Sequence, residues 1–174
     1  MQITGGTYKG RKILAPDENI TRPTLSKVRM GVFNTLFSLI GDFENKSFLD
    51  LFGGSGIMGL EALSRGFSEV TVFEKNPKAA QIIKKNYETL GLKPTLYVGN
   101  SLKLLKQQAE NFDIIYIDPP YKSGIYEEII SLINWDSLVI AEHSEDISPS
   151  NVTLIKEKNY GGKRVSFFNT KKLS

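Results

Sequence analysis

From residue 47 onward, short apolar runs alternate regularly with longer segments in which apolar residues recur at helical spacing. The short runs are rich in branched and aromatic residues. They predict buried strands at 47–52, 69–74, 94–98, 112–118 and 137–143. The longer segments predict helices at 56–66, 76–91, 100–110 and 124–133. Because such alternation requires right-handed crossovers, it predicts a doubly wound α/β domain whose mostly parallel sheet is covered on both faces.

The two ends of the chain depart from this alternation. Near the C-terminus, two extended runs flank the turn "NYGGKR" and predict an antiparallel hairpin over 152–169. At the N-terminus, "QITGG" and "GRKIL" predict a small hairpin, and 25–41 predicts an amphipathic helix. The apolar stripe of that helix is expected to contain the following residues: Val28, Phe33, Leu36, Phe37 and Ile40.

The length of 174 residues fits one domain, which we expect to cover residues 1–174. Within it, a basic hairpin-and-helix extension, 1–40, precedes the core, 41–174. Residues 1–40 carry a net charge of +4 and residues 156–174 one of +5, whereas 41–155 carries −6. This asymmetry points to a polyanion held from the flanks, although terminal lysines that only aid solubility would give the same pattern.

Composition excludes several kinds of chemistry. The chain has no cysteine and a single histidine, His143, which leaves little material for a zinc site or a Ser-His-Asp triad. We therefore expect no metal, and chemistry that uses carboxylates, backbone groups or a bound cofactor. No apolar run approaches the roughly 18 residues that span a bilayer, and no signal peptide is recognisable, so we expect a soluble, cytoplasmic protein without membrane contact.

A glycine-rich loop joins the first core strand to its helix. Its residues are Gly53, Gly54, Ser55 and Gly56. Ligands in open α/β sheets bind at the carboxyl ends of the strands, where such a loop lets a ligand approach the backbone closely. Glu74 ends the second strand, twenty residues after Gly54, and can accept hydrogen bonds from ribose hydroxyls. The pattern indicates a cofactor that contains adenosine.

Asp50 helps to distinguish between two such cofactors. It lies near the end of the first strand and therefore close to the glycine loop. A carboxylate there attracts the sulfonium and ammonium groups of S-adenosylmethionine and repels the diphosphate of NAD. We therefore favour S-adenosylmethionine and keep NAD as the alternative.

The segment "DPPY" follows the fourth buried strand and comprises Asp118, Pro119, Pro120 and Tyr121. The Asp118 carboxylate and the Pro119 carbonyl are two acceptors on a stiff turn, and together they can bind both hydrogens of a base amino group. Tyr121 offers a flat face on which the base can stack. Orientation of this kind contributes up to ~7–11 kcal/mol, so the turn predicts transfer to an amino group. An ordinary Asp-Pro turn is the alternative.

These motifs resemble a known family. "DPPY" after an apolar strand is the hallmark of amino-group methyltransferases that act on nucleic acids. Nearly end to end, the chain is similar to the RsmD family, which methylates the N2 amino group of a guanine in 16S ribosomal RNA. The segments that carry the similarity are "ITGGTYKGRKI", "TRPTLSKVRMGVFNTL", "DLFGGSGIMGLEALSRG", "AEHS" and "NYGGKRVSFF". The resemblance implies a Rossmann-like, seven-stranded class I methyltransferase sheet and S-adenosylmethionine as cofactor.

The resemblance also implies a partner and site residues. The partner is 16S rRNA, within an assembling or assembled small ribosomal subunit, bound by a monomer. Cofactor binding is expected from Asp50, Phe52, Gly53, Gly54, Ser55, Gly56, Glu74, Lys75, Asn100 and Ser101. RNA binding is expected from Lys9, Arg11, Lys12, Arg22, Thr24 and Arg29. Members commonly carry alanine in place of Gly53 and glutamate in place of Met30.

Two other functions stay open. A DNA adenine-N6 methyltransferase would act on the same kind of amino group, but the chain has no obvious room for a DNA-recognition domain. A non-catalytic RNA-binding assembly factor could use the same scaffold, although the intact glycine loop and Asp118 turn argue against it.

Overall fold

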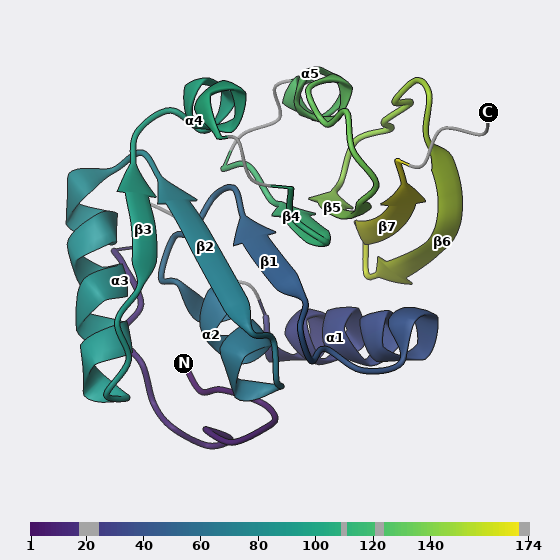
Figure 1. Ribbon diagram of the computed structural model, residues 1–174. Coiled ribbons are helices and arrows are strands. Elements are labelled where there is room, and N and C mark those ends of the chain that lie inside the picture. Colours follow the sequence, from purple (N-terminus) through teal and green to yellow (C-terminus); the bar gives the residue numbers. More distant parts are fainter. Residues whose placement is uncertain (18–24, 109–110, 121–123, 171–174) are drawn as a thin grey trace.

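The computed structural model describes residues 1–17, 25–108, 111–120 and 124–170, and within them seven strands form one sheet (Figure 1). The strand order is β3-β2-β1-β4-β5-β7-β6. The strands are β1 (Ser47–Asp50), β2 (Glu69–Glu74), β3 (Thr95–Val98), β4 (Ile114–Ile117), β5 (Leu138–His143), β6 (Thr153–Tyr160) and β7 (Lys163–Asn169). Strands β1 to β5 pair in parallel, and β7 pairs antiparallel with β5 and β6. The predicted α/β sheet and its C-terminal hairpin are confirmed.

Helices cover both faces of this sheet. They are α1 (Ser26–Ile40), α2 (Ile57–Ser64), α3 (Pro77–Thr89), α4 (Ser101–Gln107) and α5 (Ile125–Ser131). Because successive side chains of a strand point to opposite faces, Phe48 and Tyr116 pack with α1, α2 and α3, whereas Leu49 and Ile115 pack with α4 and α5. Figure 1 shows α1 and α4 on opposite sides of the strands. In the parts of the chain that the structure describes, no helix is long and apolar enough to cross a membrane.

The N-terminal segment pairs less extensively than the sequence predicts. One antiparallel bridge joins Gln2 to Lys12, with backbone hydrogen bonds from Ile3 N to Arg11 O and from Ile13 N to Met1 O. Ile3 and Ile13 are buried in the same apolar cluster as α1 and the sheet. This segment therefore packs on the core.

Helix α1 turns a different set of residues inward than the one expected. Val28, Phe33 and Leu36 are buried as predicted, but Phe37 is 59% exposed and the prediction for it was wrong. The buried positions follow the rotation of 3.6 residues per turn, which brings Val32 inward and moves Phe37 to the margin of the contact. There the Phe37 and Phe43 rings are nearly perpendicular, with their centroids 6.0 Å apart.

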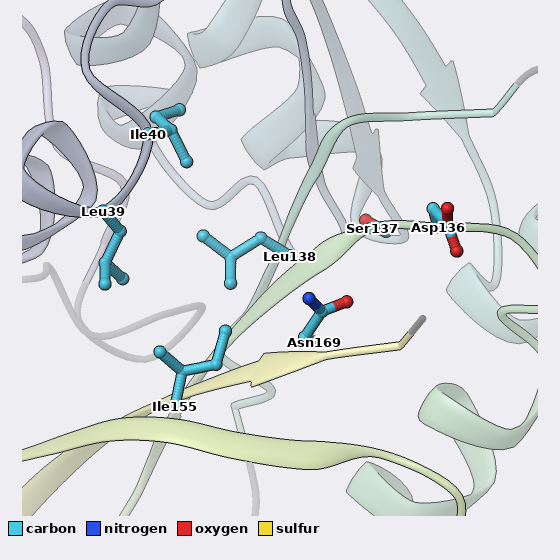
Figure 2. Close-up of a pocket in the computed structure, with 7 residues that line it drawn as sticks. All are labelled: Leu39, Ile40, Asp136, Ser137, Leu138, Ile155 and Asn169. Atoms are coloured by element: carbon cyan, nitrogen blue, oxygen red, sulfur yellow. The ribbon is translucent and has the colours of Figure 1, made fainter. Parts of the chain in front are cut away.

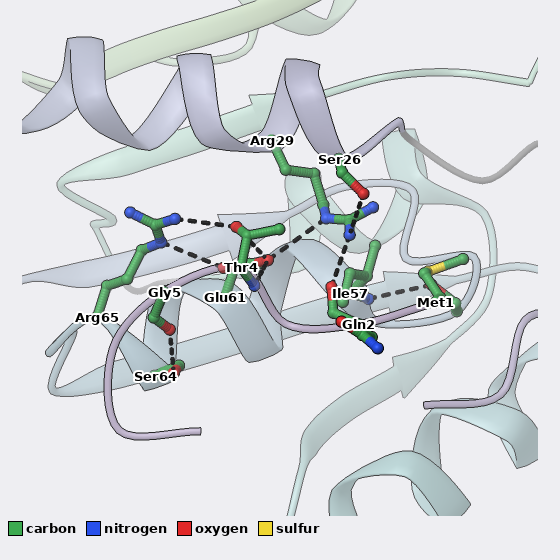
Figure 3. Close-up of polar contacts among 11 residues, drawn as sticks. Met1, Gln2, Thr4, Gly5, Ser26, Arg29, Ile57, Glu61, Ser64 and Arg65 are labelled. Carbon is green, nitrogen blue, oxygen red and sulfur yellow. Dashed lines mark hydrogen bonds and ion pairs between the residues drawn. The ribbon is translucent and has the colours of Figure 1, made fainter. Parts of the chain in front are cut away.

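A buried carboxylate ties the N-terminal segment and α1 to α2 (Figure 3). Glu61, which is 0% exposed, accepts hydrogen bonds from Thr4 N at 2.7 Å and Thr4 Oγ1 at 2.8 Å. Figure 3 shows Arg29 and Arg65 approaching it from opposite sides, at 3.4 and 3.2 Å. Both carboxylate oxygens are thus engaged, as a buried charge requires.

Arg29, which the sequence suggested as an RNA contact, is 1% exposed, and this prediction is corrected. Its guanidinium faces Glu61 and donates to Gln2 O at 2.7 Å. Burial lowers the pKa of Arg29, and the neighbouring Glu61 opposes that shift. Arg29 therefore serves the packing of α1 on α2.

Glu61→Gln is expected to lower the free energy of unfolding by about 3 kcal/mol, because it leaves the buried charge of Arg29 without its counter-ion. Urea unfolding followed by circular dichroism measures the change. The matched control is Glu69→Gln on the exposed end of β2, which should change stability by less than about 0.5 kcal/mol. Equal effects of the two substitutions would contradict the role assigned to Glu61.

Candidate active site

Four charged side chains meet at the carboxyl ends of the parallel strands. Asp50 ends β1, Asp118 follows β4, Glu142 lies on β5, and Lys163 begins β7. These strands are consecutive neighbours in the sheet. Because side chains alternate with a period of two, all four residues belong to the face that α1 to α3 cover. The result is a row of three acids and one lysine along one edge of the sheet.

Lys163 links two of the acids. Its Nζ lies 3.6 Å from Asp118 Oδ1 and 3.5 Å from Glu142 Oε1. The Tyr116 hydroxyl donates a hydrogen bond to the other carboxylate oxygen of Glu142. Glu142 is 4% exposed, whereas Asp118 retains 20% exposure and is accessible from solvent. Asp118 is therefore the acid of this pair that a substrate can reach.

Burial shifts the titration of two of these acids towards neutral pH. It raises the pKa of Asp118 to about 8, with further increases from Glu142 and Asp50 and an opposing effect of Lys163. It also raises the pKa of Asp50 to about 7, while the hydrogen bond from Phe52 N opposes the shift. Strongly shifted carboxyls that share one edge of a sheet are typical of functional sites, and their negative charge favours a cationic ligand.

In the described part of the chain, no group of three or more His, Cys, Asp or Glu side chains is positioned to hold a metal ion.

The glycine loop lies beside this row and is fixed by β2. Gly53 N donates to Phe73 O at 2.9 Å, and Gly54 N donates to Glu74 Oε1 at 2.8 Å. The other Glu74 oxygen accepts from Asn76 N at 2.7 Å. Each carboxylate oxygen keeps a lone pair that a hydroxyl can use. The structure thus brings Glu74 and the loop together, and the binding of ribose by Glu74 stays a prediction.

Close packing requires glycine in this loop. A Cβ at Gly53 would lie 2.4 Å from Val72 Cγ1, and Gly56 has a φ of +82°, which disfavours side chains. Val72 occupies the space that an alanine at position 53 would need. The glycine is therefore matched to its neighbour in this chain.

Two of the predicted cofactor-binding residues, Asn100 and Ser101, lie next to the same loop. Ser101 Oγ donates a hydrogen bond to Leu51 O, and Asn100 caps α4 by accepting from Lys103 N at 3.1 Å. Gly99 N donates to Glu74 O at 2.9 Å. The structure thus joins the start of α4 to the end of β1 and to Glu74. The predicted cofactor residues Phe52, Ser55 and Lys75 belong to the same two loops after β1 and β2.

Three of the predicted RNA-binding residues, Lys9, Arg11 and Lys12, lie on the N-terminal segment and not in the row of acids. Lys9, Arg11 and Lys12 are exposed, but their segment contacts the C-terminal ends of α2 and α3. Arg11 Nη2 donates to Thr89 O at 3.1 Å, for example. Near the end of α3, Asn86 donates to Ser55 O at 2.9 Å and to Leu14 O at 2.8 Å, so the N-terminal segment also approaches the glycine loop. The contact of these three cations with RNA stays a prediction.

Three predicted site residues lie outside the described residues: Tyr121, Arg22 and Thr24. Conversely, Glu142 and Lys163 belong to the site although the sequence did not single them out. The signal that could have found them is their position, since Glu142 ends a predicted strand and Lys163 follows the Gly-Gly turn. His143 is 2% exposed, with its ring nitrogens 2.7 Å from Glu145 O and 2.7 Å from Ser166 Oγ, which agrees with a structural role.

An apolar hollow of about 340 Å³ lies at the opposite edge of the sheet (Figure 2). Its lining consists of Leu39, Ile40, Asp136, Ser137, Leu138, Ile155 and Asn169. It surrounds the beginning of β5, whereas Glu142 lies near the end of that strand. The hollow is therefore separate from the row of acids.

Comparison with known proteins gives concordant matches. Residues 1–169 match the family model described as Conserved hypothetical protein 95. "Ribosomal RNA small subunit methyltransferase D" of Escherichia coli (strain K12) is 36% identical over 172 residues, which cover 92% of this chain and 85% of that protein. "Putative rRNA methyltransferase YlbH" of Bacillus subtilis (strain 168) is 33% identical over 177 residues, which cover 92% and 94%.

Solved structures agree. The "Putative methyltransferase yhhF from Escherichia coli" is 30% identical, with a TM-score of 0.81 over 97% of both chains. A putative methylase from Haemophilus influenzae is 34% identical, with a TM-score of 0.74 over 97% of both chains. The α/β fold with a Rossmann-like, mostly parallel seven-stranded sheet is thus shared with methyltransferases.

Asp50→Asn is expected to stabilise the protein at pH 8 by up to about 4 kcal/mol. An unfolded aspartate ionises near pH 4, whereas the pKa of folded Asp50 is about 7. The unfolded state therefore loses this proton first, and the free energy of unfolding falls as pH rises from about 4 to about 7. Asparagine removes this contribution. Urea unfolding at pH 5 and pH 8 measures it.

The control for this measurement is Asp136→Asn, which changes an exposed aspartate at the other edge of the sheet. It should keep the wild-type difference between the two pH values. An Asp50→Asn variant that shows the same difference would contradict the shifted titration of Asp50.

Proposed function

Because the chain belongs to the RsmD family, as its match over residues 1–169 and its relatives at 36% identity show, we propose that it is an S-adenosylmethionine-dependent methyltransferase of small-subunit ribosomal RNA. The proposed acceptor is the exocyclic N2 amino group of a guanine in 16S rRNA. The observation that carries the proposal is the accessible Asp118, which lies at the same sheet edge as the glycine loop.

The chemistry of the donor set fits S-adenosylmethionine. When bound, it supplies an electrophilic methyl group on a sulfonium centre. Glu74 has lone pairs left for ribose hydroxyls, and Gly53 and Gly56 let the loop pack closely on Val72 and Ile83 beside it. Asp50 provides a buried carboxylate whose ionisation a neighbouring cation favours. The negative charge of Asp50 would repel the diphosphate of NAD, which disfavours NAD as the cofactor.

Asp118 and the Pro119 carbonyl are the acceptors for the amino group. The lone pair of a base amino group is delocalised into the ring, and two acceptors hold the group so that the lone pair points outward. The proline rings fix φ in this turn, so the acceptors are oriented before the substrate arrives. When the nitrogen gains the methyl group it must lose a proton, and the ionised Asp118 is a base within reach. Stacking on Tyr121 is part of the proposal.

Substrate identity is tested by transfer of labelled methyl groups to small ribosomal subunits, naked 16S rRNA and duplex DNA in parallel. We expect incorporation into small subunits purified from cells that lack the protein, because a chain of 174 residues offers little area for reading sequence and more for recognising a particle. Nucleoside mass spectrometry should find the label in N2-methylguanine. Incorporation into DNA with none into ribosomal RNA would instead support an adenine methyltransferase.

Asp118→Ala is expected to slow methyl transfer at least about 100-fold, because it removes an acceptor that polarises the amino group. Calorimetry should show S-adenosylmethionine binding within about threefold of wild type. Asp136→Ala is the control, since it removes an exposed aspartate at the far edge of the sheet and should leave the rate unchanged. Full activity of Asp118→Ala would refute the mechanism.

The rate of the wild-type enzyme should also depend on pH. Ionised Asp118 is the stronger acceptor for the amino group and the form that can take its proton, so transfer should rise with pH. The pKa of Asp118 is about 8 without ligand, and a bound cation lowers it, so the midpoint should lie at or below about 8. A rate that falls with increasing pH over this range would contradict the role of Asp118.

A further inference from the structure

We propose that Lys163 is a positioning residue for methyl transfer, which keeps the Asp118 carboxylate ionised and oriented towards the amino group of the substrate. This inference rests on the proposed function. It adds a residue from the C-terminal hairpin to a site otherwise formed by Glu142 on β5 and the loops after β1, β2, β3 and β4. Lys163 acts through Asp118 and has no assigned contact with substrate.

The geometry comes from three neighbouring strands. Asp118 follows β4, Glu142 lies on β5, and Lys163 begins β7, which pairs with β5 through His143 and Arg164. Strand β7 lies two strand spacings from β4, about 10 Å. The Lys163 side chain crosses this span to place Nζ 3.6 Å from Asp118 and 3.5 Å from Glu142. If the Lys163 side chain reached only the adjacent strand β5, it would not contact Asp118.

Glu142 is held so that one carboxylate oxygen faces Lys163. The Tyr116 hydroxyl donates to Glu142 Oε2, and the Tyr126 hydroxyl donates to the Glu142 backbone carbonyl at 2.6 Å. The ion pair with Lys163 uses the remaining oxygen, Oε1. Glu142 thus fixes the lysine from one side, which leaves the amino group of Lys163 directed at Asp118.

The start of β7 is also anchored. Gly161 and Gly162 take φ values of +59° and +89°, which form the tight turn before Lys163. Arg164, the next residue, is held by Asp146 Oδ1 at 2.7 Å and Ser144 O at 3.0 Å. These contacts fix the backbone from which Lys163 extends. The cation therefore has a defined position although its side chain is 37% exposed.

Asp118 needs such a cation because its other neighbours disfavour its charge. Glu142 from β5 and Asp50 from β1 repel it, and Tyr116 from its own strand and Tyr126 from α5 are near enough to interact with it. Acids that share a site suppress one another's ionisation, and a nearby cation reverses the effect. Among the described residues, Lys163 is the cation that forms an ion pair with Asp118.

The kinetic test compares Lys163→Met and Lys163→Arg with wild type in single-turnover methyl transfer across a range of pH. Without the cation, the acidic limb of the pH–rate profile of the Met variant should shift to higher pH by about 1 unit. At pH values below the wild-type midpoint, transfer should therefore be about tenfold slower. At high pH its rate should approach the wild-type rate. The Arg variant should restore most of the wild-type profile. An unshifted limb for the Met variant would overturn the proposal.

Lys156→Met is the matched control, because Lys156 is an exposed lysine on β6 of the same hairpin. It removes the same charge without touching Asp118, so its acidic limb should coincide with that of wild type. If it moved the limb as far as Lys163→Met does, the effect would reflect the overall charge of the hairpin, and the role of Lys163 would be rejected.

A second readout needs no methyl transfer. Carbon-13 NMR of the side-chain carboxyls, with Asp118 assigned by its loss in Asp118→Asn, follows the titration directly. Lys163→Met should raise the midpoint of Asp118 by about 1 pH unit. Active wild type with an unmoved midpoint would overturn the Lys163 inference alone. A moved midpoint in a protein that methylates no nucleic acid would refute the proposed function and the role towards substrate, while the electrostatic support of Asp118 by Lys163 would stand.

Discussion

The parallel pairing of β1 with β4 is the constraint on which the rest of the structure depends. From β1 the chain adds β2 and β3 on one side, then returns to place β4 on the other side, and Leu51 N still bonds to Tyr116 O at 3.1 Å where the two strands end. In open α/β sheets, ligands bind where the strand order reverses in this way, outside the carboxyl ends of the strands. The glycine loop follows β1 and the Asp118 turn follows β4.

Two sets of buried acids in this protein differ in how fully they are compensated. Glu61 forms ion pairs with two arginines and accepts hydrogen bonds from the backbone and the hydroxyl of Thr4. Its charge is therefore compensated, and it stabilises the packing of the N-terminal segment and α1 on α2. At the site, Asp50 and Asp118 have fewer partners than their burial demands, and their pKa values rise to about 7 and about 8. Incomplete compensation leaves these acids able to respond to a cation or an amino group, which a fully paired carboxylate cannot do.

The core of the fold could be predicted from the sequence because its signals are local. The spacing of apolar residues and the Gly-Gly turn are enough to predict strands β1 to β7. The order of the loops along the sheet is enough to predict where the Asp118 turn lies. The errors concern long-range contacts. Nothing near Arg29 indicates that it pairs with Glu61, and charge alone made it resemble an RNA contact. Lys163 was missed because its approach to Asp118 depends on the antiparallel register of β7 with β5.

The sequence separation of these contacts also sets an order in time. A chain is synthesised from its N-terminus, so Thr4 and Arg29 are made before Glu61. They can form their contacts with the Glu61 carboxylate only after that residue has been added. Asp118 likewise cannot form its ion pair with Lys163 until β7 has been synthesised. A nascent chain that stops short of β7 can already contain both the glycine loop and the Asp118 turn. The antiparallel hairpin is therefore the step that completes the charge balance around Asp118.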